Sequence, residues 1–233
     1  MFVVRGRPAD ATRDGRVGRA MLERAGRTRE AGVRAWRPHP QVAFGPRDVR
    51  HEGHPAAARA ARAAGLEPTE RRVGGHPVAL TGTTVACTWV VPIEDARRGL
   101  RARYGTVAKR LRGALADLGV EATSGEPPNS FCPGQHSLSA VGKVVGLAQR
   151  VTADAAAVSG VVVTADHERI GAVLAEVYPA LGLAFDPDSV GSIERAGGEA
   201  DPSAVEAAVE AHLLDGAPVG AVEAEALLAE SAP

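Results

Sequence analysis

Lysine is almost absent from this chain of 233 residues. Only two of its 27 basic residues are Lys, and the other 25 are Arg. Lys109 lies in an Arg-rich stretch as one more solvated charge, whereas Lys143 lies in the apolar segment Gly142-Lys143-Val144-Val145-Gly146. An ammonium is a compact charge with three donors and a guanidinium is a planar fork, so the sequence indicates a need for an amine at Lys143. The alternative interpretation is a surface lysine on a hairpin.

Other scarce residue types exclude several classes of function and partner. Aromatic residues make up 3% of the chain, which argues against surfaces that stack the bases of single-stranded nucleic acid. The two cysteines, Cys87 and Cys132, are too few to staple a fold of this size, so we expect a reducing, cytoplasmic setting. Neither has metal-binding spacing, and no metal site is predicted. No apolar run approaches the roughly 18 residues of a membrane span, so no membrane partner is expected.

Charge is divided unevenly along the chain. Residues 1–112 hold 23 of the 27 basic residues and 10 of the 28 acidic ones, and the remainder lie in residues 113–233. A basic half steers acidic partners such as phosphates, nucleotides or an acidic carrier protein. Alternatively, the acidic half neutralises the basic half within one fold. The arginines form no dense patch interleaved with aromatics, so nucleic acid is not an expected partner.

Hydrophobic periodicity predicts an α+β fold with a mixed β-sheet flanked by helices. Strands are expected at residues 1–5, 33–38, 41–45, 68–73, 77–80, 83–91, 137–140, 143–151 and 157–164. Helices are expected at residues 13–25, 56–64, 93–118, 167–181, 203–214 and 219–229.

A glycine-rich turn is the first segment suited to chemistry. It reads Arg71-Arg72-Val73-Gly74-Gly75-His76 and is expected to join two strands. Two glycines permit positive φ and let the backbone approach a ligand closely. The arginines and the N–H groups of such a turn can grip a carboxylate or a phosphate. The simpler interpretation is an ordinary turn with a surface histidine.

Cys132 is the second feature suited to chemistry. It leads the Pro133-Gly134 turn, eleven positions before Lys143. A thiolate is a good nucleophile toward thioesters, and a nearby cation stabilises it. Cys87 lies among apolar strand residues and is expected to be inert. The alternative for Cys132 is a half-buried packing residue.

Taken in order, four segments resemble the catalytic domains of the biotin/lipoate protein ligase superfamily, which includes lipoate–protein ligases and octanoyltransferases. They are Trp36-Arg37-Pro38, the Arg71–Gly75 turn, Cys132 in its loop, and Gly142-Lys143-Val144-Val145-Gly146-Leu147-Ala148-Gln149. The resemblance covers about residues 1–190. It implies that Lys143 contacts the acyl carbonyl and the phosphate or thioester. The residues that it implies for acyl or substrate binding are Arg71, Arg72, Gly74, Gly75, His76, Gly142, Gly146 and Ala148.

The resemblance also implies an activity. Cys132 resembles the nucleophile of the octanoyltransferase branch, in which an octanoyl group passes through an enzyme thioester to a lysine of a lipoyl-carrier domain. Implied carriers are the E2 subunit of a 2-oxoacid dehydrogenase or the glycine cleavage H protein, with acyl carrier protein as a donor. No cofactor is needed. We expect an acyl-transfer catalytic domain over residues 1–195 and a C-terminal helical appendage over residues 196–233.

Two alternative functions stay open. An ATP-dependent lipoate–protein ligase would use ATP and magnesium to form an acyl-adenylate, with Lys143 at its phosphate and a separate accessory subunit. A non-catalytic acyl-binding or scaffolding subunit would use Cys132 only for packing.

Overall fold

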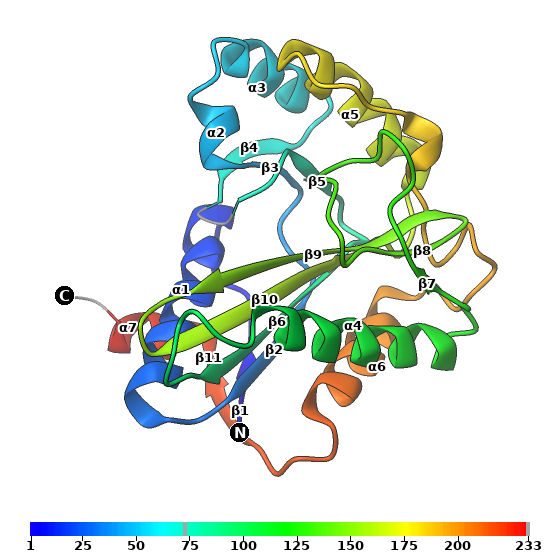
Figure 1. Ribbon diagram of the computed structural model, residues 1–233. Coiled ribbons are helices and arrows are strands. Elements are labelled where there is room, and N and C mark those ends of the chain that lie inside the picture. Colours follow the sequence, from blue (N-terminus) through cyan, green and yellow to red (C-terminus); the bar gives the residue numbers. More distant parts are fainter. Residues whose placement is uncertain (72–73, 232–233) are drawn as a thin grey trace.

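The computed structural model describes residues 1–71 and 74–231, and within them eight strands form one central sheet (Figure 1). The strand order is β11 (Gly220–Glu223), β1 (Phe2–Arg5), β2 (Gly32–Trp36), β6 (Val85–Pro92), β10 (Ala155–Val162), β9 (Gly142–Val151), β8 (Leu138–Ala140) and β7 (Thr123–Ser124). Strands β11 and β2 run parallel to β1, whereas the other neighbours are antiparallel. The predicted mixed sheet and α+β class are confirmed.

A second, three-stranded sheet and three helices form a separate layer at the top of the molecule in Figure 1. Its strands are β3 (Gln41–Phe44), β4 (Glu67–Glu70) and β5 (Val78–Leu80), and its helices are α2 (Pro46–Val49), α3 (His54–Ala63) and α5 (His167–Ala180). Phe44, Leu174 and Tyr178 belong to its apolar core. Phe131, from the loop between β7 and β8, is buried in the same core and anchors that loop.

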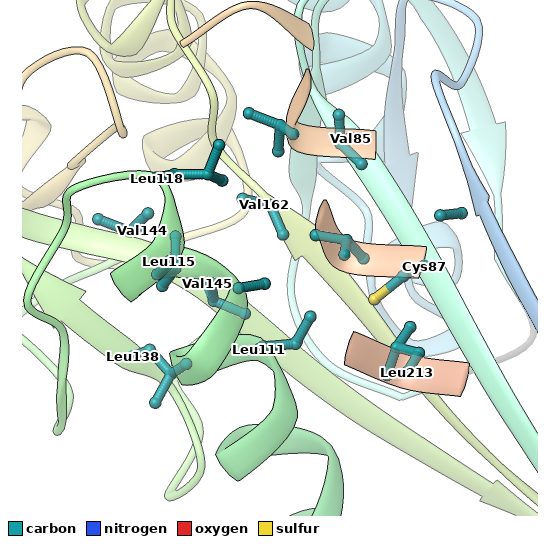
Figure 2. Close-up of a cluster of buried hydrophobic side chains, with 14 of the residues drawn as sticks. Val85, Cys87, Leu111, Leu115, Leu118, Leu138, Val144, Val145, Val162 and Leu213 are labelled. Carbon is teal, nitrogen blue, oxygen red and sulfur yellow. The ribbon is translucent and has the colours of Figure 1, made fainter. Parts of the chain in front are cut away.

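The two faces of the large sheet have different coverings because side chains alternate along each strand. Val85 and Cys87 of β6 face α4 (Leu100–Asp117) and α6 (Pro202–Leu214), where they pack with Leu111 and Leu213 (Figure 2). Burial raises the pKa of Cys87 to about 12, in agreement with its expected inertness. The opposite face is covered in part by α1 (Ala11–Thr28).

Helix α4 begins at Leu100, so the predicted start at residue 93 is wrong. Asp95 turns the chain instead: its carboxylate accepts from the backbone N–H of Arg97 at 2.9 Å, and its carbonyl accepts from that of Arg98 at 3.2 Å. Asp side chains compete in this way for backbone groups that a helix would use. Gly99 then adopts a φ of 75°, outside the right-handed helical region.

The last predicted helix, residues 219–229, is also wrong in its first half. Residues Gly220–Glu223 form β11 on the free edge of β1, and α7 (Ala224–Glu230) follows. An Ala- and Glu-rich segment favours a helix locally, but the unpaired backbone groups of β1 offer a full set of strand hydrogen bonds.

The C-terminal segment is packed into the rest of the molecule. Val205, Val209 and Leu213 of α6 join the core beneath β2 and β6, and Leu227 of α7 packs with α1. Residues 196–231, predicted as an appendage, thus complete the sheet edge, and the domain boundary at residue 195 stays a prediction. Among the described residues, no helix has both the length and the apolar character needed to cross a membrane.

Replacing Leu227 by Ala is expected to destabilise the protein by about 2–5 kcal/mol, because a fully buried leucine leaves a cavity between α7 and α1. Urea denaturation measures this loss. The matched control is Leu100→Ala, since Leu100 is an exposed leucine, and it is expected to change stability by no more than about 0.5 kcal/mol. Equal stability of the two variants would show that α7 does not contribute to the fold.

Candidate active site

A cavity of about 1180 Å³ lies over the face of the large sheet that α1 borders. Its floor consists of small residues on three neighbouring strands, including Ala86 of β6, Ala157 of β10, and Gly146 and Ala148 of β9. These short side chains leave the space above the sheet unfilled. Arg71 and Cys132 also line the cavity, so four of the predicted site residues share one space.

Cys132 is held at three points in the loop between β7 and β8. Its backbone N–H donates to the hydroxyl of Tyr178 at 2.6 Å, and its carbonyl accepts from Nζ of Lys143 at 2.9 Å. Its Sγ accepts from Nη2 of Arg71 at 3.3 Å. Cys132 also has a φ of 41°, which is uncommon for a residue with a side chain. These contacts hold a strained backbone and direct the sulfur to the cavity.

Gly75 makes room for this sulfur. Its φ is 107°, and a Cβ there would lie 2.5 Å from Sγ of Cys132 and 3.0 Å from Nη2 of Arg71. Gly74 has open space around it, so only the second glycine of the turn is required by its surroundings. Arg72, the other arginine of this predicted motif, lies outside the described residues.

His76 points to a buried carboxylate. Its Nδ1 lies 3.3 Å from Oδ1 of Asp48, whose Oδ2 accepts from the backbone N–H of Gly45 at 2.8 Å. The His76 side chain is 39% exposed, and neither His76 nor Gly74 is among the described residues that line the cavity.

Lys143 is buried, with 0% of its side chain exposed, so the interpretation as a surface lysine is wrong. Its Nζ donates to the carbonyls of Phe131 and Cys132 at 2.8 and 2.9 Å, and it contacts Oε1 of Glu126 at 2.9 Å. Burial lowers the pKa of Lys143, and the carboxylate of Glu126 opposes that shift. The ammonium therefore lies beneath the Cys132 loop with its three hydrogens engaged.

Lys143 is close to the cavity without lining it. A Cβ placed on Gly146, which does line it, would lie 3.4 Å from Cε and 3.9 Å from Nζ of Lys143. Gly142 acts elsewhere, since its φ of 78° brings the turn between β8 and β9 against the backbone of residues 189–191. Gly142 is not among the described residues that line the cavity.

Glu126 is a site residue that the sequence analysis missed. It accepts from the hydroxyls of Ser130 and Ser137, from the backbone N–H of Gly134 at 2.9 Å, and from Lys143. Burial alone would raise the pKa of Glu126, but these hydrogen bonds hold it below its ordinary value. One glutamate among 28 acidic residues has no distinctive spacing, so only the folded loop identifies it.

Among the residues that the structure describes, no group of three or more His, Cys, Asp or Glu side chains is arranged to hold a metal ion.

Replacing Glu126 by Gln is expected to destabilise the protein at neutral pH by up to about 3 kcal/mol, because it leaves the charge of Lys143 buried without its partner. Since the folded-state pKa of Glu126 lies below 4.5, its contribution is present above that pH and disappears as the pH falls through the lowered pKa. Thermal melts from pH 7 to pH 3 should therefore show a difference between wild type and variant that narrows with acid. A difference independent of pH would contradict this assignment.

Solved structures of lipoate-attaching enzymes have the same fold. Lipoate-protein ligase A bound with ATP aligns over 98% of this chain and 92% of that chain, with a TM-score of 0.77 and 15% identity. A bi-partite lipoate protein ligase of Thermoplasma acidophilum, solved in a study of the ligase and its E2 lipoyl domain, aligns over 98% and 90%, with a TM-score of 0.63 and 17% identity. At these identities the likeness establishes the fold.

One curated relative is named as an octanoyltransferase. The octanoyl-[GcvH]:protein N-octanoyltransferase of Exiguobacterium sibiricum is 29% identical over 124 residues. The matched region is 53% of this chain and 45% of that protein, so it spans less than half of the relative's length.

The family itself is established by a family model that matches most of the chain. The family model of the lipoyl protein ligase A/B catalytic domain matches residues 17–214, a span that includes Arg71, Cys132 and Lys143. This match confirms the resemblance to the biotin/lipoate ligase superfamily. The chain belongs to the lipoyl protein ligase A/B catalytic domain family.

Proposed function

We propose that this protein transfers an octanoyl or lipoyl group to a lysine of a lipoyl-carrier domain through a thioester on Cys132. The observation that carries the proposal is the position of the Cys132 sulfur: it borders a large cavity, 3.3 Å from the guanidinium of Arg71. The guanidinium lies where it can pair with the negative charge of a thiolate, which is the reactive form of a cysteine. The name of the Exiguobacterium relative supports the same activity.

In the first step, the Cys132 thiolate attacks the carbonyl carbon of an octanoyl thioester on the donor. A bond forms between that carbon and Sγ, the carbon–sulfur bond of the donor breaks, and the donor thiol leaves with the proton that Cys132 gave up. Arg71 stabilises the thiolate before attack. The cavity exceeds the roughly 300–1,000 Å³ of common ligand pockets, so it has room for the acyl chain and a carrier's lysine arm.

In the second step, the amine of the carrier's lysine attacks the thioester carbon. An amide bond forms, the bond to Sγ breaks, and the amine's proton passes to the departing sulfur. Negative charge builds on the acyl oxygen in both steps, and one stabilising contact to such an oxygen is worth roughly 3–4 kcal/mol. We assign this stabilisation to the charge of Lys143, which lies behind Gly146 at the cavity wall. Lys143 can donate a hydrogen bond to the acyl oxygen itself only if it gives up its hydrogen bond to one of its three present acceptors.

The partners follow from the same reaction. Lipoyl-carrier domains, either the glycine cleavage H protein or a 2-oxoacid dehydrogenase E2 subunit, are the proposed acceptors, and acyl carrier protein is a further candidate donor. Arg16 of α1 lines the cavity, and its positive charge suits an acidic carrier. Arg13 and Arg19 line the cavity too, but they are paired with Glu225 and Glu23.

The ATP-dependent ligase stays the alternative prediction. One similar structure is of a ligase bound with ATP, and another is of a bi-partite ligase. A ligase would release pyrophosphate when incubated with ATP, magnesium and free lipoate, in the absence of any acyl thioester. The proposed transferase would release none.

Replacing Cys132 by Ser is expected to abolish the acyl adduct and to reduce transfer at least about 100-fold, because an alcohol is a far poorer nucleophile than a thiolate. Intact-mass spectrometry after mixing with an octanoyl-loaded carrier detects the adduct. Cys87→Ala is the matched control and should keep the adduct, since Cys87 is buried in the core. Full transfer by Cys132→Ser would exclude the thioester mechanism.

Replacing Gly75 by Ala is expected to slow adduct formation at least about 10-fold, because the new Cβ would displace the sulfur of Cys132 and strain the backbone. Gly74→Ala adds the same methyl group where nothing lies within 4 Å, and it should stay within about twofold of wild type. The rate of adduct formation measures both variants. Similar rates for the two would show that the close approach of Gly75 to the sulfur does not matter.

A further inference from the structure

Glu126 is the centre of the loop that presents Cys132. Its Oε2 accepts from Gly134 and Ser137, and its Oε1 accepts from Ser130, so the carboxylate joins both sides of Cys132. Nζ of Lys143 lies 2.9 Å from Oε1 and 3.2 Å from Oε2. The carboxylate is 20% exposed, and its partners come from the loop itself and from β9.

A continuous series of contacts leads from Glu126 to the sulfur. Glu126 binds the ammonium of Lys143, and the ammonium binds the carbonyls of Phe131 and Cys132. Together with the Tyr178 hydroxyl on its N–H, this fixes both peptide groups of Cys132 and hence the position of Sγ beside Arg71.

A carboxylate is needed for this arrangement. An ammonium without exposure is costly unless it is paired, and its uncharged form has only two hydrogens for the three groups that accept from Lys143. The charged or titratable groups that face Lys143 are Glu126, Cys132 and Arg71, and Glu126 is the acidic one in direct contact. Its loss would release the ammonium and the loop together.

We propose that Glu126 is a positioning residue of the acyl-transfer site. Its carboxylate holds Lys143 and, through Lys143, places the sulfur of Cys132 beside Arg71. This inference rests on the proposed function for its role in catalysis. The placement of the sulfur, in contrast, can be measured without any acyl substrate.

The first test compares alkylation of Cys132 by iodoacetate, an anion, with alkylation by the neutral iodoacetamide. A guanidinium beside the sulfur favours the anion, and the ratio of the two rates cancels differences in accessibility. Wild type should have a higher ratio than Arg71→Met. Glu126→Gln should lower the ratio at least about threefold toward that of Arg71→Met. Removing a negative charge without moving the sulfur would instead raise the ratio, so a ratio that is unchanged or higher overturns the proposal.

The second test measures octanoyl transfer to a lipoyl-carrier domain. Glu126→Gln should lower kcat about 10-fold or more, with the KM for the carrier within about twofold. Lys143→Met and the double variant should be equally impaired, because Glu126 acts through Lys143. The proposal would be overturned if the reduction in kcat of the double variant equalled the product of the reductions in the two single variants. Glu121→Gln removes an exposed charge from the same segment and should match wild type.

If a thermal melt shows that the Glu126→Gln variant is unfolded, the alkylation test is made with Ser137→Ala instead. It removes one hydrogen bond to the carboxylate and leaves the charge, so the alkylation ratio should fall in the same direction by a smaller factor. An unchanged ratio would then count against the proposal. If wild type forms no octanoyl adduct, the proposed function fails and the alkylation test still decides the placement of the sulfur.

Discussion

The contact between the ammonium of Lys143 and the carboxylate of Glu126 is the interaction on which the candidate site depends. A lysine with no exposed surface is stable only with a charged partner and a full set of acceptors, and here the partner and the two carbonyls all belong to one loop. Burying the amine therefore shapes the loop. The same contact explains why arginine does not replace this lysine: a planar fork cannot aim three donors from a single atom at acceptors converging from different directions.

The turn at Gly75 and the loop of Cys132 form one unit, although 57 positions separate them. Arg71 donates both to the carbonyl of His76 and to the sulfur, so the guanidinium joins the two segments. The turn thus gives the nucleophile its place, and of its described residues only Arg71 also lines the cavity. The glycines of this family motif were expected to bind the substrate. In this structure Gly75 instead makes room for the sulfur of Cys132.

Composition and spacing identified the residues whose chemical type is rare in this chain. Lys143 and Cys132 stood out because lysines and cysteines are few, and Gly75 because two glycines between strands permit positive φ and a close approach of the backbone. Glu126, Tyr178 and Asp48 could not be found in this way, since their types are common or their partners are distant in sequence. Strand β11 was missed for a related reason: local propensity predicts a helix, and only the open edge of β1 makes a strand preferable.

The position of β11 has a consequence for biosynthesis. Strand β1 pairs on one edge with β2, which follows it closely in the chain, but its other edge stays unpaired until Gly220–Glu223 are made more than 200 residues later. Acidic side chains near that late segment then meet arginines made early, as in the pairs of Arg24 with Glu230 and Arg13 with Glu225. The uneven charge of the chain is thus partly neutralised inside the molecule, and the nascent protein carries an open sheet edge beside an Arg-rich helix until Gly220–Glu223 have been made.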